Sequence, residues 1–156
     1  MLAGMDIRNA HFAELDPLTL HDILKLRADV FIIEQRCLYP DIDGRDTEPA
    51  TVHCWAERDG EIHAYVRLLT GEGNTAIIGR VVTSPEARSK GLGTTMVTYA
   101  IGLTDRPLVI HAQAQLERWY AALGFATHGD TFLEDGQPHV EMRRAAPTPS
   151  AVDRLI

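Results

Sequence analysis

The sequence has few cysteines, no long apolar run and no excess of positive charge, and each absence limits what the protein can be. Among 156 residues the only cysteines, Cys37 and Cys54, have neither CxxC nor metal-ligand spacing, so we expect free thiols and no metal site. No apolar stretch reaches the ~18 residues that span a bilayer, and the opening MLAGMDIRNAHF lacks the apolar core of a signal peptide. We therefore expect a cytoplasmic protein with no membrane partner.

Positive charge is in deficit. Fifteen lysines and arginines stand against 22 aspartates and glutamates, which gives a formal net charge of −7. Nucleic-acid binding needs a basic face that neutralises phosphates, so the composition argues against a nucleic-acid partner. Hydrophobic residues make up 45% of the chain, enough to bury one core. We expect one domain over residues 1–145 and a proline-containing tail over residues 146–156.

Apolar periodicity predicts an α/β fold of the α+β type. Asp16-Pro17 is typical of a helix start, and Asp59-Gly60 is typical of a tight hairpin turn. The predicted order is β-α-β-β-β-α-β-α-β-β, a mixed and mostly antiparallel sheet flanked by helices. Strands are expected at residues 8–14, 52–58, 61–69, 74–83, 108–112, 125–128 and 139–143, and helices at 17–33, 91–103 and 115–123. Residues 34–50 form a long acidic loop between them.

The stretch RSKGLG, from Arg88 to Gly93, lies between a predicted strand and a predicted helix. Glycine lets the backbone adopt positive φ and approach a ligand closely, and the first N–H groups of a helix point outward without partners. Such a turn suits a pyrophosphate, and Arg88 and Lys90 add local positive charge. By itself the motif also fits an ordinary turn, since it lacks the Gly-Lys-Ser/Thr end of the triphosphate loop and the third glycine of the dinucleotide fingerprint.

Several separated blocks resemble one known family. GRVVTSPEARSKGLGTTMV, followed by AQLERWYAALGF, resembles the GNAT superfamily of acetyl-CoA-dependent N-acetyltransferases. VFIIEQRCLYPDIDGRD, IGRVV, HAQAQLERWY and EDGQPHVEM resemble its ElaA-type branch. The resemblance covers nearly the whole chain. It implies the GNAT fold and direct acetyl transfer from acetyl-CoA to a primary amine of an unknown small molecule or peptide.

The resemblance also implies roles for particular positions. The backbone of a β segment would pair with the pantetheine arm of acetyl-CoA, and the glycine turn would hold the pyrophosphate. Gln113 stands where many members carry an asparagine that contacts the cofactor arm, and Ser89 stands where a glycine is common. Tyr120 matches the tyrosine near the thioester sulfur, so it is the general-acid candidate. The expected cofactor-binding residues are Val81, Val82, Thr83, Arg88, Ser89, Lys90, Gly91, Leu92, Gly93, Thr94, Gln113 and Tyr120.

The sequence does not single out the general base that must deprotonate the amine. His111 and His139 are candidates because imidazole titrates near neutral pH, and Glu34 is a third candidate. Each of them also fits a structural role, and a chain of waters could do the same work. Cys37 is a poor candidate for an acyl-carrying nucleophile because no motif beside it would activate the thiol.

Three further alternatives stay open. The acidic loop either screens the mouth of the acceptor site and favours cationic amines, or is a solvated surface. The protein is either an active acetyltransferase, a non-catalytic acetyl-CoA-binding or sensor module, or an interaction protein whose glycine turn is incidental. An edge strand near the C-terminus would allow a homodimer. The carboxylates of the acidic loop are Asp41, Asp43, Asp46 and Glu48.

Overall fold

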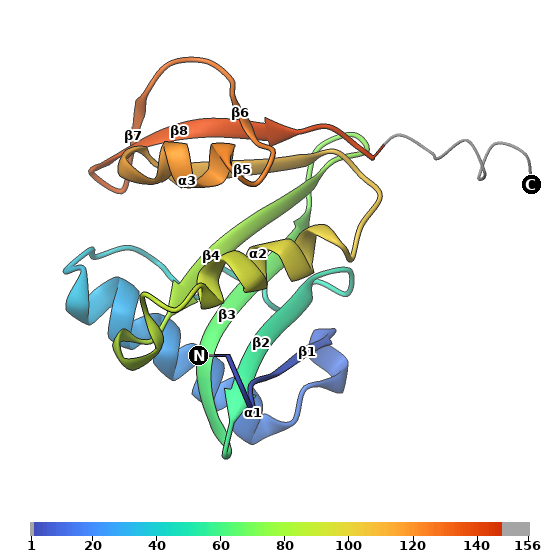
Figure 1. The fold of residues 1–156 in the computed structure, drawn as a ribbon, viewed down its shortest axis with the longest axis vertical. Coiled ribbons are helices and arrows are strands. Elements are labelled where there is room, and N and C mark those ends of the chain that lie inside the picture. The colour runs from blue at the N-terminus through green and yellow to red at the C-terminus, as the bar shows by residue number, and fades with distance from the viewer. Residues whose placement is uncertain (1, 148–156) are drawn as a thin grey trace, which may run out of the picture.

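A computed structural model describes residues 2–147, which build one open sheet with helices on both faces (Figure 1). Residues 148–156 of the predicted tail lie outside the described residues. The strands are β1 (Asp6–Ala10), β2 (Val52–Arg58), β3 (Glu61–Thr70), β4 (Ala76–Thr83), β5 (Leu108–Gln113), β6 (Ala126–Thr127), β7 (Phe132–Glu134) and β8 (Gln137–Arg144). The α-helices are α1 (Pro17–Arg27), α2 (Leu92–Ile101) and α3 (Glu117–Ala121), and η2 (Ala28–Glu34) is a π-helix. Short 3-10 turns are η1 (Phe12–Glu14), η3 (Pro85–Ala87) and η4 (Ala114–Leu116).

The sheet order is β1-β2-β3-β4-β5-β8-β6, and β7 pairs with β8. All neighbours are antiparallel except β4 and β5, which run parallel. This confirms the predicted mixed, mostly antiparallel sheet flanked by helices. No helix within residues 2–147 combines the length and the apolar character needed to cross a membrane.

Local details differ from the expectations. The first strand ends at Ala10 rather than at residue 14, because residues 12–14 turn into η1. The first helix keeps its Asp16 cap but changes from α to π winding at Ala28. Strand β7 was not predicted, and together with β6 it covers the outer side of β8. The strand predicted at residues 125–128 forms as β6 and pairs with β8, and β7 is an additional short strand at the same sheet edge.

Strand alternation divides the interior into two cores. On β3, Ala64, Val66 and Leu68 face α2 and α3, whereas Tyr65 faces α1 and η2. Successive side chains of a strand point to opposite faces, so the central strands supply both cores. Figure 1 shows the sheet lying between these helices.

Strand β4 carries a β-bulge. Gly79 pairs with Arg67 and Val82 pairs with Tyr65, so Arg80 and Val81 together oppose the single residue Val66. An extra residue reverses the alternation, and Val82 accordingly packs into the core beside α1. Arg80 adopts φ of 52°, a left-handed conformation that strains a residue with a side chain.

Strands β4 and β5 part soon after they begin. Their only register pairs are Ala76 with Leu108 and Ile77 with Val109. Figure 1 shows the two strands diverging beyond this point. Backbone groups on that side of β4 therefore have no strand partner beyond Ile77, at the place where the bulge lies.

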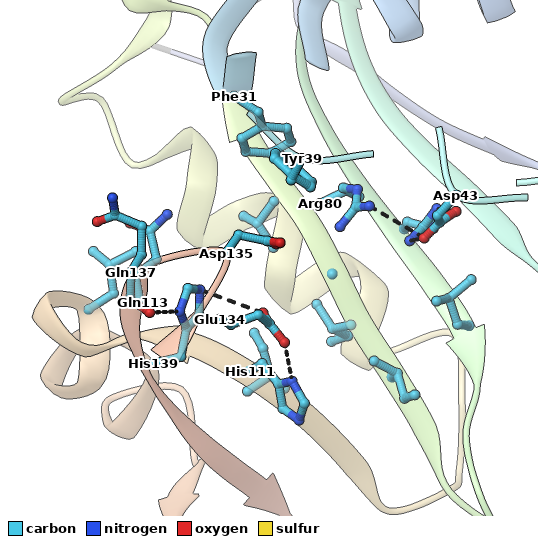
Figure 2. Close-up of a pocket in the computed structure, with 18 of the residues that line it drawn as sticks. Phe31, Tyr39, Asp43, Arg80, His111, Gln113, Glu134, Asp135, Gln137 and His139 are labelled. Carbon is cyan, nitrogen blue, oxygen red and sulfur yellow. Dashed lines mark hydrogen bonds and ion pairs between the residues drawn. The ribbon is translucent and has the colours of Figure 1, made fainter. Parts of the chain in front are cut away.

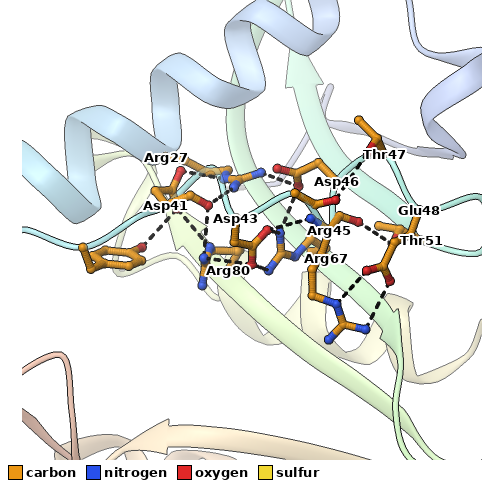
Figure 3. A network of polar contacts seen from close by, with 12 residues as sticks. Arg27, Asp41, Asp43, Arg45, Asp46, Thr47, Glu48, Thr51, Arg67 and Arg80 are labelled. Atoms are coloured by element: carbon orange, nitrogen blue, oxygen red, sulfur yellow. Dashed lines mark hydrogen bonds and ion pairs between the residues drawn. The ribbon is translucent and has the colours of Figure 1, made fainter.

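Three arginines and three aspartates form a largely buried ionic network, which we call the arginine–aspartate network (Figure 3). Arg27, fully buried, contacts Asp41 at 3.0 Å and Asp46 at 2.7 Å. Arg67 contacts Asp43 at 2.8 Å and Asp46 at 3.1 Å. The paired guanidinium groups hold the pKa of Asp43 and Asp46 below the ordinary value, although burial opposes this.

The network changes the interpretation of the acidic loop. Asp41 and Asp46 are buried, and Arg80 lies 2.9 Å from Asp41 and 3.3 Å from Asp43. Both sequence-based interpretations, an electrostatic screen and a solvated surface, are therefore wrong for Asp41 and Asp46. Their charges are neutralised inside the protein, where they fasten the loop to α1, β3 and β4.

We expect Arg27→Ala to lower the free energy of unfolding by about 3–5 kcal/mol, because it leaves Asp41 and Asp46 buried without this partner. Urea unfolding followed by circular dichroism measures the change. Lys25→Ala removes an exposed ion pair from the same helix and is the control, which should leave the midpoint unchanged. Equal midpoints for Arg27→Ala and the wild type would contradict the role given to the network.

Candidate functional site

Two cavities lie beside the bulged end of β4 and share part of their lining. The glycine-turn cavity, about 490 Å³, is bounded by η2, the end of β4, the turn before α2, and α3. The histidine cavity, about 380 Å³, is bounded by the acidic loop, β4, β5 and the β7–β8 hairpin (Figure 2). Both are lined by Phe31, Gln35, Val81, Leu116 and Tyr120.

The glycine turn is shaped to receive an anion. Ser89 and Gly91 have positive φ of 66° and 79°, and Gly91 is the N-cap of α2. Within residues 2–147, no backbone N–H from Ser89 to Thr94 donates a hydrogen bond. Alternating backbone handedness brings successive N–H groups toward one point, and the helix dipole adds positive potential there. A negatively charged group such as a phosphate would fit at the glycine turn.

Most residues predicted for cofactor binding line the glycine-turn cavity. They are Val81, Val82, Thr83, Arg88, Ser89, Gly91, Leu92, Gly93, Thr94 and Tyr120. Lys90 is not among the lining residues, and its ammonium group lies 3.4 Å from the carbonyl of Glu86. Gln113 lines the histidine cavity instead and accepts a hydrogen bond from Gln115. Binding roles for these residues remain predictions.

Arg88 and Glu34 form an ion pair at the glycine-turn cavity. The guanidinium donates to both carboxylate oxygens at 2.8 and 2.6 Å, and its Nε donates to the carbonyl of Thr83. The hydrogen bonds from Arg88 lower the pKa of Glu34. Glu34 is therefore a poor proton acceptor, which argues against its predicted role as a base. Glu34 would also compete with a bound anion for the guanidinium of Arg88.

Tyr120 stands where the two cavities meet. Its ring packs edge-on against Trp119 and Phe125, with centroids 4.7 and 5.9 Å away, and it is 4% exposed. Its hydroxyl has no hydrogen-bond partner within residues 2–147. Burial raises the pKa of Tyr120, so the phenol keeps its proton at neutral pH. The ring of Tyr120 therefore packs in the core, and its hydroxyl is left without a hydrogen-bond partner among the described residues.

The histidine cavity brings His111 and His139 together around a carboxylate that the sequence analysis missed. Glu134 lies 2.9 Å from His111 Nδ1 and 3.7 Å from His139 Nε2 (Figure 2). Phe132 packs against both imidazole rings. Asp135-Gly136 is typical of a two-residue hairpin turn, and the register of such a turn places Glu134 on the same face as His139, a signal that could have located this carboxylate.

The opposite wall of the histidine cavity is also charged. Arg80 and Asp43 belong to the arginine–aspartate network and line this cavity, and the Arg80 guanidinium stacks 5.1 Å from the ring centre of Tyr39. Cys37 lies here too, and its thiol donates to the carbonyl of Asp135 at 3.5 Å, which joins the acidic loop to the hairpin. Among residues 2–147 no three histidine, cysteine or acidic side chains are grouped to hold a metal ion.

The sequence and the fold are similar to those of known proteins. Residues 22–146 match the acetyltransferase (GNAT) domain family. A UPF0039 protein of Mycobacterium tuberculosis is 41% identical over 88% of this chain and 92% of its own length. The crystal structure of an acyl-CoA N-acyltransferase from Pseudomonas aeruginosa has a TM-score of 0.87 at 39% identity, covering 90% of this chain and 99% of that one.

The chain belongs to the GNAT acetyltransferase family and has the mixed α/β fold of that family. Within the family it falls in the ElaA-like branch. The Escherichia coli protein ElaA is 34% identical over 88% of this chain and 94% of its own length, and its crystal structure has a TM-score of 0.84, covering 90% of this chain and 99% of that one. Membership implies acyl transfer from an acyl-CoA to an acceptor.

We expect Glu34→Gln to tighten binding of inorganic pyrophosphate by roughly two- to fivefold, the range for one exposed charge, because Arg88 would lose its competing partner. Calorimetric titration at low salt measures the affinity, and the gain should shrink as ionic strength rises. Glu48→Gln is the matched control, since Glu48 pairs with Arg45 away from the turn. Unchanged or weaker affinity in Glu34→Gln would show that Glu34 does not oppose the anion.

Proposed function

We propose that the protein is an N-acetyltransferase that moves the acetyl group of acetyl-CoA to a primary amine by direct attack. The observation that carries this proposal is the meeting of two cavities at Tyr120, one with free backbone amides for a diphosphate and the other a separate chamber. A donor and an acceptor can thus approach one point from two sides. Family membership supports the acyl-CoA donor.

The residues of the glycine-turn cavity would bind the donor. The amides of residues 89–94 would receive the pyrophosphate, because helix N-termini and alternating backbone turns bind anions. Arg88 would add positive charge once Glu34 releases it. The unpaired side of β4 near Val81 would pair with the amide groups of the pantetheine arm.

The bulge and Tyr120 would support the chemistry. Negative charge develops on the thioester oxygen as the amine attacks, and a backbone N–H of β4 near Val82 would stabilise it. The departing thiolate needs a proton, and Tyr120 has an uncommitted hydroxyl at the junction of the cavities. The acceptor would enter through the histidine cavity, where Gln35, Gln113 and Gln137 offer neutral hydrogen-bonding groups.

A non-catalytic acetyl-CoA sensor of the same fold is the alternative. A sensor needs the glycine-turn cavity only. The second cavity and the proton donor between the two favour an enzyme over a sensor.

We expect Gly91→Glu to weaken acetyl-CoA binding by at least ~100-fold, because it places a like charge beside the pyrophosphate. Calorimetry measures the affinity. Gly60→Glu is the matched control: Gly60 has φ of 77° against 79° for Gly91, both sites have open space for a Cβ, and Gly60 lies in the β2–β3 turn. The two variants should unfold at similar urea concentrations. Normal acetyl-CoA affinity in Gly91→Glu would rule out the glycine turn as the donor site.

We expect Tyr120→Phe to lower turnover by about 100-fold or more while changing acetyl-CoA affinity by less than about twofold, the pattern of a lost proton donor. The variant leaves no buried polar group without a partner, so the fold should persist. The assay is free-thiol release from acetyl-CoA with a panel of arylalkylamines, polyamines, amino-acid amides and peptides. Wild-type turnover in the variant would remove Tyr120 as the acid, and no thiol release with any amine would favour the sensor.

A further inference from the structure

Three strands bring His111, Glu134 and His139 to one face of the sheet. His139 lies opposite Gln113 in the pairing of β8 with β5, and opposite Phe132 in the β7–β8 hairpin. His111 is two residues before Gln113 on β5, so its side chain points to the same face. Figure 2 shows both imidazole rings turned toward the Glu134 carboxylate inside the histidine cavity.

The contacts of His139 fix which of its nitrogens carries the proton. Nδ1 lies 2.8 Å from the carbonyl oxygen of Gln137. A carbonyl only accepts hydrogen bonds, so Nδ1 is the donor and the neutral ring keeps its lone pair on Nε2. Glu134 Oε2 lies 3.7 Å from this Nε2, close enough to stabilise the ring once Nε2 takes up a proton.

The other carboxylate oxygen of Glu134 is held by the second histidine. His111 Nδ1 lies 2.9 Å from Glu134 Oε1, and His111 Nε2 lies 3.7 Å from Glu141. Side-chain exposure rises from 12% at His139 to 41% at Glu134 and 45% at His111. The three groups therefore run from the cavity wall to solvent, and a proton taken up at His139 has a way out.

We propose that His139 Nε2 is the general base that deprotonates the acceptor amine, and that Glu134 is the positioning residue that orients and stabilises the His139 ring. The proposal rests on the acetyltransferase function proposed above. It fits a primary amine that arrives protonated, because the cluster combines a free lone pair with a neighbouring negative charge.

The proton balance closes with the residues already described. An ammonium group gives its first proton to His139 Nε2, and that proton passes to solvent. The amine lone pair then forms the C–N bond as the C–S bond breaks. Tyr120 gives its phenolic proton to the departing thiolate, and the second proton lost by the nitrogen restores the phenol. The products are an N-acetyl amide and a free thiol.

Titratable and charged side chains line every wall of the histidine cavity around His139. Glu134 and Asp135 belong to the hairpin, and the remaining groups are neutral or paired. The guanidinium of Arg80 is already matched by the carboxylates of the acidic loop. The titratable and charged groups of this cavity are Cys37, Tyr39, Asp43, Arg45, Arg67, Arg80, His111, Tyr120, Glu134 and Asp135.

The test joins a spectroscopic measurement with a kinetic one. Long-range ¹H–¹⁵N spectra of the imidazoles should show neutral His139 protonated on Nδ1, with the signal assigned by its loss in His139→Gln. This arm needs no acceptor. A neutral His139 protonated on Nε2 would overturn the proposal, because no lone pair would face the cavity.

The kinetic arm follows kcat/KM against pH with phenethylamine, or with the amine of the panel that reacts fastest. His139→Gln should lower kcat/KM by about 10²-fold or more and abolish the acidic limb of the profile. Glu134→Gln should lower it by about tenfold through kcat rather than KM, because the ring loses the carboxylate that orients it. Glu141→Gln, which removes a carboxylate that contacts His111 and Arg143, is the matched control for Glu134→Gln and should leave kcat and KM near the wild-type values.

Weakly basic hydroxylamine separates base catalysis from a structural defect. It is largely unprotonated at neutral pH, so His139→Gln should cost less with hydroxylamine than with phenethylamine. Equal losses, or an acidic limb that survives in His139→Gln, would overturn the assignment of the base and leave the acetyltransferase function intact. A wild-type protein that binds acetyl-CoA but acetylates no amine would refute both proposals together.

Discussion

The parting of β4 from β5 is the constraint on which the rest of the site depends. Two parallel register pairs join the strands, and beyond Ile77 the facing side of β4 has no strand partner. An unpaired strand edge inside a fold must be satisfied by something else, because buried backbone groups need hydrogen-bond partners. Both cavities lie beside this free edge, and Tyr120 stands between them. The separation of two strands thus creates one place that two ligands can reach.

The bulge at Arg80 is held by residues distant in the sequence. A left-handed conformation costs a residue with a side chain of order 1–3 kcal/mol. Asp41 and Asp43 attract the Arg80 guanidinium, and Tyr39 stacks against it. The acidic loop therefore acts mainly inside the protein: it holds the bulge that turns Val82 toward the core beside α1 and leaves Val81 facing the core beside α2.

Much of the fold could be predicted because its signals are local. Alternation marked β2 and β3, Asp59-Gly60 marked the turn between them, and the glycines marked the start of α2. The bulge at Arg80 has no such local signal, since it depends on carboxylates that come about forty residues earlier. Strand β7 is too short for alternation to reveal it, and its pairing comes from the hairpin turn.

The candidate site also contains residues with a local sequence signal and residues that only the fold brings together. The turn residues were found because glycines and cations there are adjacent in the sequence, and their roles remain predictions. Glu134 was missed because the histidines that it contacts lie on two other strands. The ion pair of Arg88 with Glu34 was missed for the same reason, as its partners are brought together only by η2.

The arginine–aspartate network also bears on how the protein responds to heat. The hydration of ions becomes less favourable as temperature rises, so the cost of withdrawing the network's four buried charged groups, Arg27, Asp41, Asp46 and Arg67, from water falls on warming. The long segment between η2 and β2 is thus anchored by contacts whose net contribution grows in warm conditions, when loops without such anchors loosen first. We therefore expect the acidic loop, which forms one wall of the histidine cavity, to stay folded on warming because the arginine–aspartate network anchors it.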